Sequence, residues 1–287
     1  MSAPVSPPFV LAGVIGWPVT HSRSPLLHGH WIAEHGLRGA YVPLAVAPGR
    51  LEAALRGLPA LGFAGCNVTI PHKVDTLRLV DRVEPLAHRI GAVNLVVVAA
   101  DGTLEGRNTD AFGFLQSLHE SRCGWRADAG PAVVLGAGGA ARAIVAGLID
   151  AGAREIRLLN RTTARADQLA ADLQGAGSTC LVQVLPWAAR HEALAGASLL
   201  VNTTSQGMHG QEPLDLRLDA LPRAGVVCDA VYAPLETSLL AAARARGHPV
   251  VDGLGMLLHQ ARPAFEAWFG VRPEVTPALR AKVEATL

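Results

Sequence analysis

The chain has 287 residues, of which half are apolar, and its formal net charge is +1 at neutral pH. This length accommodates two domains of ordinary size, and the small net charge argues against an extended nucleic-acid footprint or a disordered tail. The four cysteines lack the paired spacing of a zinc site or a disulfide framework, which fits a reducing compartment: Cys66, Cys123, Cys180 and Cys228. We therefore expect small-molecule partners and no nucleic acid.

The first eight residues contain no basic stretch followed by a long apolar segment, and no apolar run in the chain is long enough to cross a bilayer. These features predict a short loose leader, no membrane attachment and a cytoplasmic location. The sequence leaves open whether the protein is a monomer or a homodimer.

Short apolar, β-rich runs alternate with amphipathic helical patterns, which predicts an α/β fold with largely parallel strands. In the first part we expect strands at 9–15, 40–46, 65–68 and 92–99, and helices at 51–58 and 71–80. A second series begins after Pro131, with strands at 132–135 and 155–160 and near Leu181, Leu199, Val226 and Val250, which predicts a doubly wound sheet. Final helices at 255–269 and 276–287 are expected to pack back on the first domain.

Lys73 is one of only two lysines among the 25 basic side chains. In a chain so rich in arginine, a retained lysine indicates a property that arginine lacks. Arginine does not deprotonate in proteins, whereas lysine is a compact ammonium whose pKa falls readily on burial. Lys73 is therefore a candidate for proton transfer, and the alternative is an exposed lysine at the start of a helix.

A glycine-rich turn follows the predicted strand at 132–135. The run Gly136-Ala137-Gly138-Gly139-Ala140-Ala141 fits the G-x-G-x-x-G/A fingerprint of dinucleotide-binding domains. In that fingerprint Gly136 permits the tight turn, Gly138 lets the backbone approach a pyrophosphate, and Ala141 allows close helix packing. Because a strand precedes the turn, a helix follows it and another strand comes at the expected distance, the segment predicts a nucleotide site.

The end of the next strand distinguishes between NAD and NADP. NAD-binding domains place Asp or Glu there to accept from the ribose 2′-hydroxyl, but this chain has Leu159-Asn160-Arg161-Thr162-Thr163, with Arg165 one turn later. Guanidinium groups give bidentate, charge-assisted hydrogen bonds to a phosphate. The pattern favours NADP, and the alternative is that Arg161 and Arg165 are solvated arginines at a helix start.

Several motifs, spread over nearly the whole chain and in the right order, resemble the shikimate dehydrogenase family, whose members interconvert 3-dehydroshikimate and shikimate with NADPH. The motifs that carry the resemblance are Gly16-x-Pro18-x-x-His21-Ser22-x-Ser24-Pro25, Asn67-Val68-Thr69-Ile70-Pro71-His72-Lys73, Gly91-Ala92-Val93-Asn94, Gly106-Arg107-Asn108-Thr109-Asp110, Gly136 to Ala141, Asn160-Arg161-Thr162, Asn202-Thr203-Thr204-Ser205-x-Gly207-Met208, Tyr232-x-Pro234-x-x-Thr237 and Gly253-x-Gly255-Met256-x-x-x-x-Gln260.

The resemblance implies a division of labour. Residues 1–110, with 255–287 returning to them, would form the substrate-binding and catalytic domain, and residues 111–254 the Rossmann domain for NADP, with no metal. Ser22 and Ser24 would grip the substrate carboxylate with help from Tyr232, and Ser24 before Pro25 is also a candidate helix N-cap. The substrate hydroxyls would be bound by Thr69, Asn94, Asp110 and Gln260. The implied cofactor-binding residues are Gly136, Gly138, Gly139, Ala140, Asn160, Arg161, Thr162, Arg165, Thr203, Val231, Gly253 and Met256.

Lys73 and Asp110 are the implied catalytic pair, and the sequence does not say which of them formally moves the proton, because a coupled pair titrates as a unit. No motif indicates a catalytic role for the histidines of this part of the chain, which we expect to be structural or solvated: His21, His28, His30, His72 and His88.

Two features depart from the family pattern and bear on pocket shape: Leu95 stands where Thr is common, and Ala111 where Gly is frequent. Relatives with similar motifs accept quinate, aminoshikimate or related cyclic acids, and the intact Ser22-x-Ser24 pair favours shikimate. A non-catalytic NADP-binding sensor is a further alternative, against which the retention of both Lys73 and Asp110 argues. The expected role is in the shikimate pathway of aromatic amino-acid biosynthesis.

Overall fold

The computed structural model describes residues 8–175 and 179–287, and the chain divides into two units. Unit 1 consists of residues 1–88, 92–109 and 261–283, and unit 2 of residues 89–91, 110–260 and 284–287. The leader expected at the start of the chain lies almost wholly outside the described residues. Within the described residues no helix is both long and apolar enough to span a membrane, and no group of three or more His, Cys, Asp or Glu side chains could hold a metal ion.

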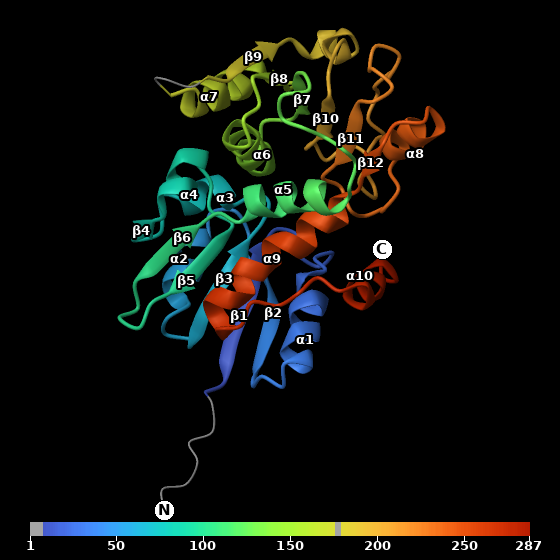
Figure 1. Ribbon diagram of the computed structural model, residues 1–287. Coiled ribbons are helices and arrows are strands. Elements are labelled where there is room, and N and C mark those ends of the chain that lie inside the picture. Colours follow the sequence, from blue (N-terminus) through green and yellow to red (C-terminus); the bar gives the residue numbers. More distant parts are fainter. Residues whose placement is uncertain (1–7, 176–178) are drawn as a thin grey trace, which may run out of the picture. The chain divides into compact units, whose positions relative to one another are not determined.

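Unit 1 is built on a mixed six-stranded sheet in the order β2-β1-β3-β5-β6-β4 (Figure 1). Its first three strands in chain order pair in parallel, as expected, but β5 runs antiparallel to β3 and β6 antiparallel to β5. The strands are β1 (Val10–Gly16), β2 (Gly39–Ala45), β3 (Phe63–Val68), β4 (Arg82–Val83), β5 (Leu95–Val98) and β6 (Leu104–Arg107), and the helices of this part of the chain are α1 (Ser24–Glu34), α2 (Leu51–Gly57), α3 (Lys73–Thr76), α4 (Pro85–Ile90) and α10 (Pro277–Glu284).

The helix expected at 71–80 is much shorter than predicted, because α3 spans only Lys73–Thr76. The Thr76 hydroxyl donates to the His72 carbonyl at 2.9 Å, and the next amides bond three residues back, Leu77 to Val74 and Leu79 to Thr76. These tight turns end the helix before β4, although the apolar spacing of the segment resembles that of a longer helix.

The two faces of the unit 1 sheet are buried by different elements. One face packs on a cluster that includes Ile15 and Val68 of the strands and Leu51 and Leu55 of α2. The other face carries Tyr41 and is covered by α1 and by the unit 1 part of α9 (Gly253–Phe269). The indole N–H of Trp268 donates to the Val96 carbonyl at 3.1 Å, and that of Trp31 donates to the Glu274 carbonyl at 3.0 Å. The C-terminal segment therefore packs within unit 1, on the first domain as predicted.

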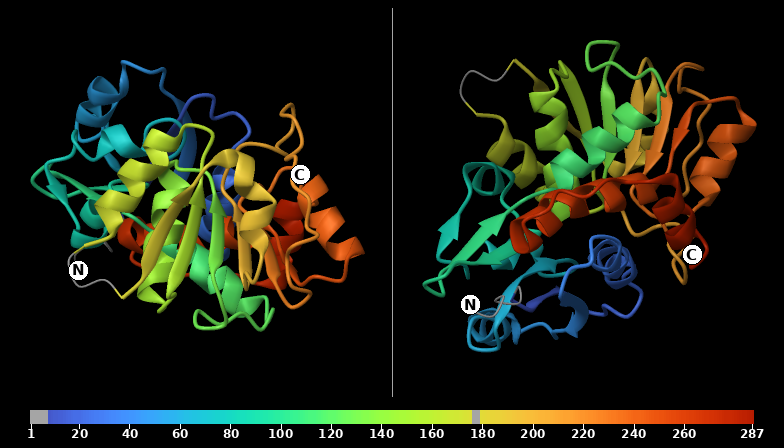
Figure 2. Two further views of the ribbon diagram at one scale, coloured as in Figure 1. Left: turned by 90° about the horizontal axis from the view of Figure 1, so that it is seen from above. Right: turned by 60° about the horizontal axis from the view of Figure 1, so that its bottom comes forward.

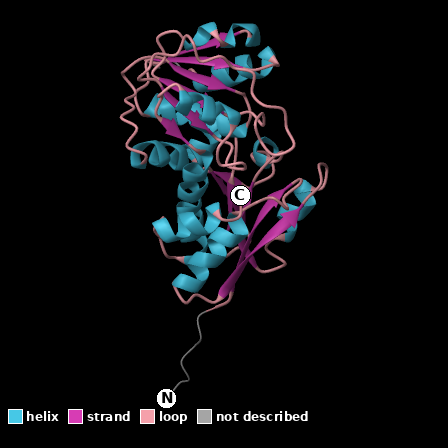
Figure 3. Ribbon diagram, turned by 90° about the vertical axis from the view of Figure 1, so that its right-hand side faces the viewer, coloured by secondary structure: helices cyan, strands magenta, loops and turns pink. Residues whose placement is uncertain are grey.

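Unit 2 has a fully parallel sheet in the order β12-β11-β10-β7-β8-β9, which is the doubly wound order (Figure 2). Helices lie on both sides of these strands (Figure 3). The strands are β7 (Ala132–Leu135), β8 (Glu155–Leu159), β9 (Leu181–Leu185), β10 (Leu199–Asn202), β11 (Val226–Asp229) and β12 (Val250–Val251), and the helices are α5 (Asp110–Glu120), α6 (Gly139–Asp150), α7 (Thr163–Leu173), α8 (Ser238–Ala245), the first part of α9 and two short 3-10 turns, η1 (Trp187–Arg190) and η2 (Glu192–Leu194). The predicted Rossmann architecture is confirmed.

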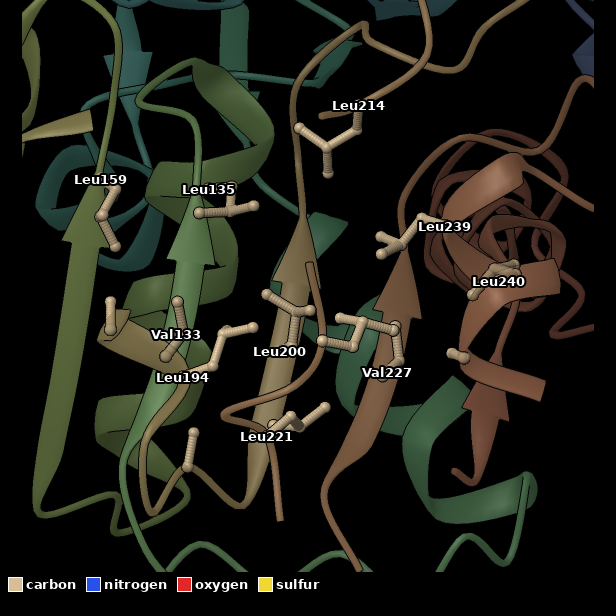
Figure 4. Packing of buried hydrophobic residues seen from close by; sticks show 14 residues of the cluster. Val133, Leu135, Leu159, Leu194, Leu200, Leu214, Leu221, Val227, Leu239 and Leu240 are labelled. Carbon is tan, nitrogen blue, oxygen red and sulfur yellow. The ribbon is translucent and has the colours of Figure 1, made fainter. Parts of the chain in front are cut away.

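Aliphatic side chains fill the space between one face of the unit 2 sheet and its covering elements (Figure 4). Val133, Leu200 and Val227 come from three adjacent strands and pack with Leu194 of η2 and Leu240 of α8. Each fully buried aliphatic side chain of this kind stabilises a fold by about 1.5–3 kcal/mol. This packing holds the carboxyl ends of β7, β10 and β11 in fixed register.

Candidate functional site

The serine turn lies between β1 and α1. Ser24 is buried and is the first residue of α1, and its amide donates to the Ser22 hydroxyl oxygen at 3.3 Å. Arg23 occupies the cap position and its side chain makes no capping bond. The prediction of Ser24 as N-cap is therefore wrong. Ser24 already lies in the helix, its amide donates to Ser22, and Pro25 is the second helical residue. The Ser24 hydroxyl is not used to cap the helix.

Lys73 is positioned by the tight turn that follows β3. The Thr69 amide donates to the Ile15 carbonyl at 2.8 Å, which joins the ends of the parallel strands β1 and β3. The His72 ring bonds the Val46 carbonyl at 2.7 Å through Nε2, and the His72 amide donates to the Thr69 carbonyl at 2.9 Å. Lys73 follows as the half-buried first residue of α3. His72 thus has a structural role, as expected for the histidines of this region.

Asn94 connects the Lys73 segment to the segment that precedes Asp110. The Val93 amide donates to the Lys73 carbonyl at 2.8 Å. The Asn94 carboxamide oxygen accepts from the Thr109 amide at 2.8 Å, and its nitrogen donates to the Thr109 hydroxyl at 3.0 Å. The network therefore links the Lys73 backbone to Thr109, the residue that directly precedes Asp110. The strand predicted at 92–99 begins only at Leu95, because the Ala92 and Val93 amides donate to the carbonyls of Ala87 in α4 and Lys73 in α3.

Asp110 and Gln260 belong to two helices of unit 2 that cross closely. Both side chains are buried; Asp110 begins α5 and Gln260 lies on α9. Gly113, one turn after Asp110, lies so near α9 that a Cβ on it would come within 2.6 Å of the Gln260 Cβ. A Cβ on Gly255 would come within 2.2 Å of the Ser117 hydroxyl oxygen. The crossing therefore requires glycine on both helices.

The glycine-rich turn lies at the carboxyl end of β7, where the strand order reverses between β7 and β10. Gly136 has φ +111°, and a Cβ on it would come within 2.4 Å of the Thr203 hydroxyl oxygen. The Thr203 hydroxyl donates to the Leu135 carbonyl at 2.7 Å. In contrast, Gly138 has open space where its Cβ would lie, directly before α6. A dinucleotide pyrophosphate fits this arrangement, because the backbone is accessible at a helix N-terminus and at the topological switch point.

The predicted 2′-phosphate residues lie between β8 and α7. The Asn160 carboxamide donates to the Thr162 carbonyl at 2.8 Å and closes the turn, and Arg161 is exposed. Arg165 is exposed in the first turn of α7. Both guanidinium groups are therefore accessible to an anion at the end of β8.

The loops after β10 and β11 are joined by one buried carboxylate that the sequence patterns did not single out. Asp229 Oδ1 accepts from Asn202 Nδ2 and from the Val231 amide, both at 3.0 Å, and Asp229 Oδ2 accepts from the Thr237 hydroxyl at 2.7 Å. Burial raises the pKa of Asp229 to about 6, although the three donors favour the charged form. Asn202 precedes Thr203, and Val231 precedes Tyr232, so Asp229 fixes both loops that carry predicted site residues.

The remaining cofactor candidates, Gly253 and Met256, lie at the start of α9. A Cβ on Gly253 would come within 2.5 Å of the Ala230 carbonyl oxygen, so the helix begins in close contact with the loop after β11. Asp252 Oδ1 accepts from the Leu254 amide at 3.0 Å and caps the helix. Met256, in the first turn, is half-buried.

Comparisons with known proteins agree with this geometry. Residues 14–96 match the shikimate dehydrogenase substrate binding domain, residues 118–207 the shikimate / quinate 5-dehydrogenase family, and residues 253–281 the shikimate 5′-dehydrogenase C-terminal domain. A shikimate dehydrogenase (NADP(+)) of Paramagnetospirillum magneticum is 62% identical over 95% of this chain and 97% of its own length. The chain belongs to the shikimate dehydrogenase family.

Two solved structures of this family show the same fold. Shikimate 5-dehydrogenase from Thermus thermophilus, in complex with NADP(H) and shikimate, has 36% identity and a TM-score of 0.84, covering 97% of this chain and 100% of that one. Quinate dehydrogenase from Corynebacterium glutamicum, in complex with NAD, has 32% identity and a TM-score of 0.88, covering 96% of this chain and 99% of that one.

Within this shikimate dehydrogenase fold, the sequence motifs contained Asn67 and Thr109 but gave neither of them a role. Asn67 Nδ2 donates to the Asn94 carbonyl at 3.1 Å, and Thr109 binds both ends of the Asn94 carboxamide. In the sequence, the sign that these residues matter was that they belong to the motifs. Their partners could be found only in the fold, because they lie 15–27 residues away in sequence.

Proposed function

We propose that the protein catalyses the NADP-dependent interconversion of shikimate and 3-dehydroshikimate in aromatic amino-acid biosynthesis. The observation that carries this proposal is the network from Lys73 through Val93 and Asn94 to Thr109, the residue directly before the second catalytic candidate, Asp110. The membership in the shikimate dehydrogenase family and the dinucleotide turn at the switch point of unit 2 support the same activity.

Substrate binding requires neutral donors for a carboxylate and polar groups for three hydroxyls. We assign the carboxylate to Ser22 and Ser24, assisted by Tyr232, because a serine turn beside a helix start offers short hydroxyl donors to an anion. Hydrogen bonds from neutral donors to a charged group contribute about 1.5–3 kcal/mol each. The substrate hydroxyls are assigned to Thr69, Asn94, Asp110 and Gln260.

NADP supplies the hydride acceptor when shikimate is oxidised and, as NADPH, the hydride donor in the reverse direction. The chain must move the accompanying proton. In ketone reduction the developing alkoxide oxygen needs a donor, and in alcohol oxidation the hydroxyl proton must be removed. We assign these tasks to Lys73, which stabilises the oxyanion with its ammonium group, and Asp110, which orients the ammonium and the neighbouring hydroxyl. The pair acts as one unit, so the proton belongs to the pair.

The cofactor is assigned to the carboxyl edge of the unit 2 sheet. The pyrophosphate would meet the backbone around Gly138 and the N-terminus of α6, and the 2′-phosphate would meet Arg161 and Arg165. The residues proposed to bind NADP are Gly136, Gly138, Gly139, Ala140, Asn160, Arg161, Thr162, Arg165, Thr203, Val231, Gly253 and Met256.

Quinate is the principal alternative substrate, because a quinate dehydrogenase shares the fold at 32% identity. The paired hydroxyls of Ser22 and Ser24 support shikimate. We also propose that the protein works in the cytoplasm on small molecules, without nucleic acid, as a monomer or a homodimer. The net charge of +1 and the dispersed cysteines support this setting.

A substrate panel tests the function. Initial rates with shikimate and quinate, each with NADP and NAD, should give the highest kcat/KM for shikimate with NADP, by at least about tenfold, the effect of a single charge-assisted contact. Lys73→Ala prepared in the same way controls for contaminating host enzyme. A higher kcat/KM with quinate would reassign the substrate. NADP binding by calorimetry without turnover of either acid would indicate the non-catalytic sensor.

A further inference from the structure

The Tyr41 side chain reaches across one strand of the unit 1 sheet to Asn67, which in turn bonds Asn94. Tyr41 lies on β2, and its hydroxyl donates to Asn67 Oδ1 on β3 at 2.7 Å, although β1 separates these strands. The register sets Tyr41 opposite Ala12, and Ala12 opposite Gly65, so all three lie on the same face. The small Ala12 and Gly65 leave room for the aromatic ring on this face, and a Cβ on Gly65 would lie within 2.4 Å of Trp268 Nε1.

The Tyr41 hydroxyl joins two segments to which we assigned substrate contacts. On one side, the Asn67 carboxamide that accepts from Tyr41 donates in turn to the Asn94 carbonyl at 3.1 Å. On the other side, the Ser24 hydroxyl donates a hydrogen bond to the Tyr41 oxygen, which favours the ionised form of Tyr41. Tyr41 thus connects the serine turn to Asn94 through the Asn67 carboxamide.

The surroundings of Tyr41 fix the direction of these hydrogen bonds. His28 stacks on the ring at a centroid distance of 4.0 Å and an interplanar angle of 6°. Burial lowers the pKa of His28 to about 3, so the imidazole is neutral, and neither ring nitrogen has a hydrogen-bond partner among the described residues. Burial, with a smaller contribution from Cys66, raises the pKa of Tyr41 well above its ordinary value. Tyr41 therefore keeps its proton throughout the working pH range and donates a hydrogen bond to Asn67 Oδ1.

We propose that Tyr41 is a positioning residue for the substrate. It holds the Asn67 carboxamide from the buried side of the sheet and accepts the Ser24 hydrogen bond until substrate binds, when the Ser24 proton turns to the substrate carboxylate. The inference rests on the proposed function. It explains why a chain with only two tyrosines keeps one in an aromatic cluster where a phenylalanine would pack equally well. The hydroxyl is needed because its two hydrogen bonds lead to residues assigned to the carboxylate and to a substrate hydroxyl.

Tyr41→Phe removes the hydroxyl and keeps the ring. We expect the KM for shikimate to rise about five- to tenfold, from the loss of hydrogen bonds that order the site, while the KM for NADP stays within about twofold. Trp31→Phe is the matched control, because it removes another hydrogen bond from the same aromatic cluster, to the Glu274 carbonyl, without a link to Asn67. It should lower the melting temperature comparably and leave the KM for shikimate unchanged.

A double-mutant cycle separates positioning from general destabilisation. In a Ser24→Ala background, Tyr41→Phe should add less than about twofold to the KM for shikimate, because coupled residues give non-additive effects. Additive effects, or a Tyr41→Phe variant with the kinetics of Trp31→Phe, would overturn the positioning role. Wild-type turnover measured in parallel distinguishes the two levels: an active wild type with an unaffected Tyr41→Phe variant overturns only this inference, whereas an inactive wild type overturns the proposed function and this inference with it.

Discussion

The two units hold their functional loops with different buried polar chemistry. In unit 1 the connecting groups are hydroxyls and carboxamides, from Tyr41 through Asn67 and Asn94 to Thr109. In unit 2 the connecting group is the carboxylate of Asp229. A neutral network keeps its hydrogen bonds over a wide pH range, whereas a buried carboxylate titrates and carries a desolvation cost.

This difference matches the tasks assigned to the units. The unit 1 network lies beneath residues that we assign to a substrate carboxylate, where another fixed negative charge would oppose binding. In unit 2, Asp229 lies behind the loops at the ends of β10 and β11, and its charge is balanced by three donors. The comparison predicts that substitutions in the unit 1 network change substrate kinetics and that substitutions at the carboxyl edge of the unit 2 sheet change cofactor kinetics or stability. Asp110, Tyr232 and Gln260 belong to unit 2 but are assigned to the substrate, so their substitution should affect substrate kinetics.

The largest effects are expected at Lys73 and Asp110. Lys73→Ala and Asp110→Asn should each lower kcat by about 10²–10⁴, the contribution of a positioned acid–base group, with smaller changes in either KM. The double variant should be much less than additive, because the two groups act as one unit. Single-turnover and steady-state rates measure this. A selective rise in the KM for NADP would contradict the assignment of Lys73 and Asp110 to proton transfer.

Ser22→Ala should raise the KM for shikimate about tenfold or more, since one hydrogen bond to a charged carboxylate contributes roughly 1.5–3 kcal/mol. The KM for NADP should not change. The control is Ser121→Ala, which removes a serine hydroxyl just after the C-terminal end of α5. It should leave both KM values unaltered. An unchanged KM for shikimate in Ser22→Ala and Ser24→Ala would move the carboxylate site elsewhere.

Arg161→Ala tests the cofactor side. Loss of a charge-assisted contact to the 2′-phosphate should raise the KM for NADP about tenfold and leave NAD nearly unaffected. The matched control is Arg154→Ala, because Arg154 is also exposed but immediately precedes β8 at its opposite end. An equal rise in the KM for both cofactors would show that Arg161 does not bind the 2′-phosphate.

Asp229→Asn should mainly change how stability depends on pH. Burial raises the folded-state pKa to about 6, above the ordinary 3.8, so the folded protein binds this proton more readily and its stability falls as pH rises through 6. Between pH 5 and pH 8 the wild type should lose about 1.4 kcal/mol of unfolding free energy relative to the variant, because Asn cannot titrate. Urea unfolding at both pH values measures the difference. If the unfolding free energy of the wild type relative to the variant stayed constant or rose between pH 5 and pH 8, the raised pKa of Asp229 would be contradicted.

The Rossmann unit was largely predictable from the sequence because its signals are local. The strand at 132–135, the glycine turn and the helix after it follow one another within a few residues, and the structure confirms each. The final helices were also predicted to within a few residues of their ends. Unit 1 was harder, because the antiparallel strand β6 and the short helix α4 have weak periodicity, and the segment at 71–80 has helical spacing but folds mostly as tight turns.

The polar networks could not be predicted from the sequence at all. Tyr41 and Asn67 are 26 residues apart, and Asn202 and Asp229 are 27 apart, on strands whose order a sequence pattern does not give. Nothing in the composition distinguishes Asp229 from an exposed aspartate until its three donors are known. Similarly, the cap prediction at Ser24 relied on the following proline, but helix α1 begins one residue earlier than that pattern requires.

The activity of Lys73→Arg is the most direct test of the central claim that Lys73 does proton chemistry in an NADP-dependent shikimate dehydrogenase. Arginine keeps the positive charge but is bulkier and does not give up its proton. If Lys73 acts as proposed, kcat for shikimate oxidation should fall by about 10²–10⁴, nearly as far as in Lys73→Ala. A kcat within about threefold of wild type, a difference of less than about 1 kcal/mol, would contradict the acid–base assignment and leave Lys73 as a charge that positions the substrate.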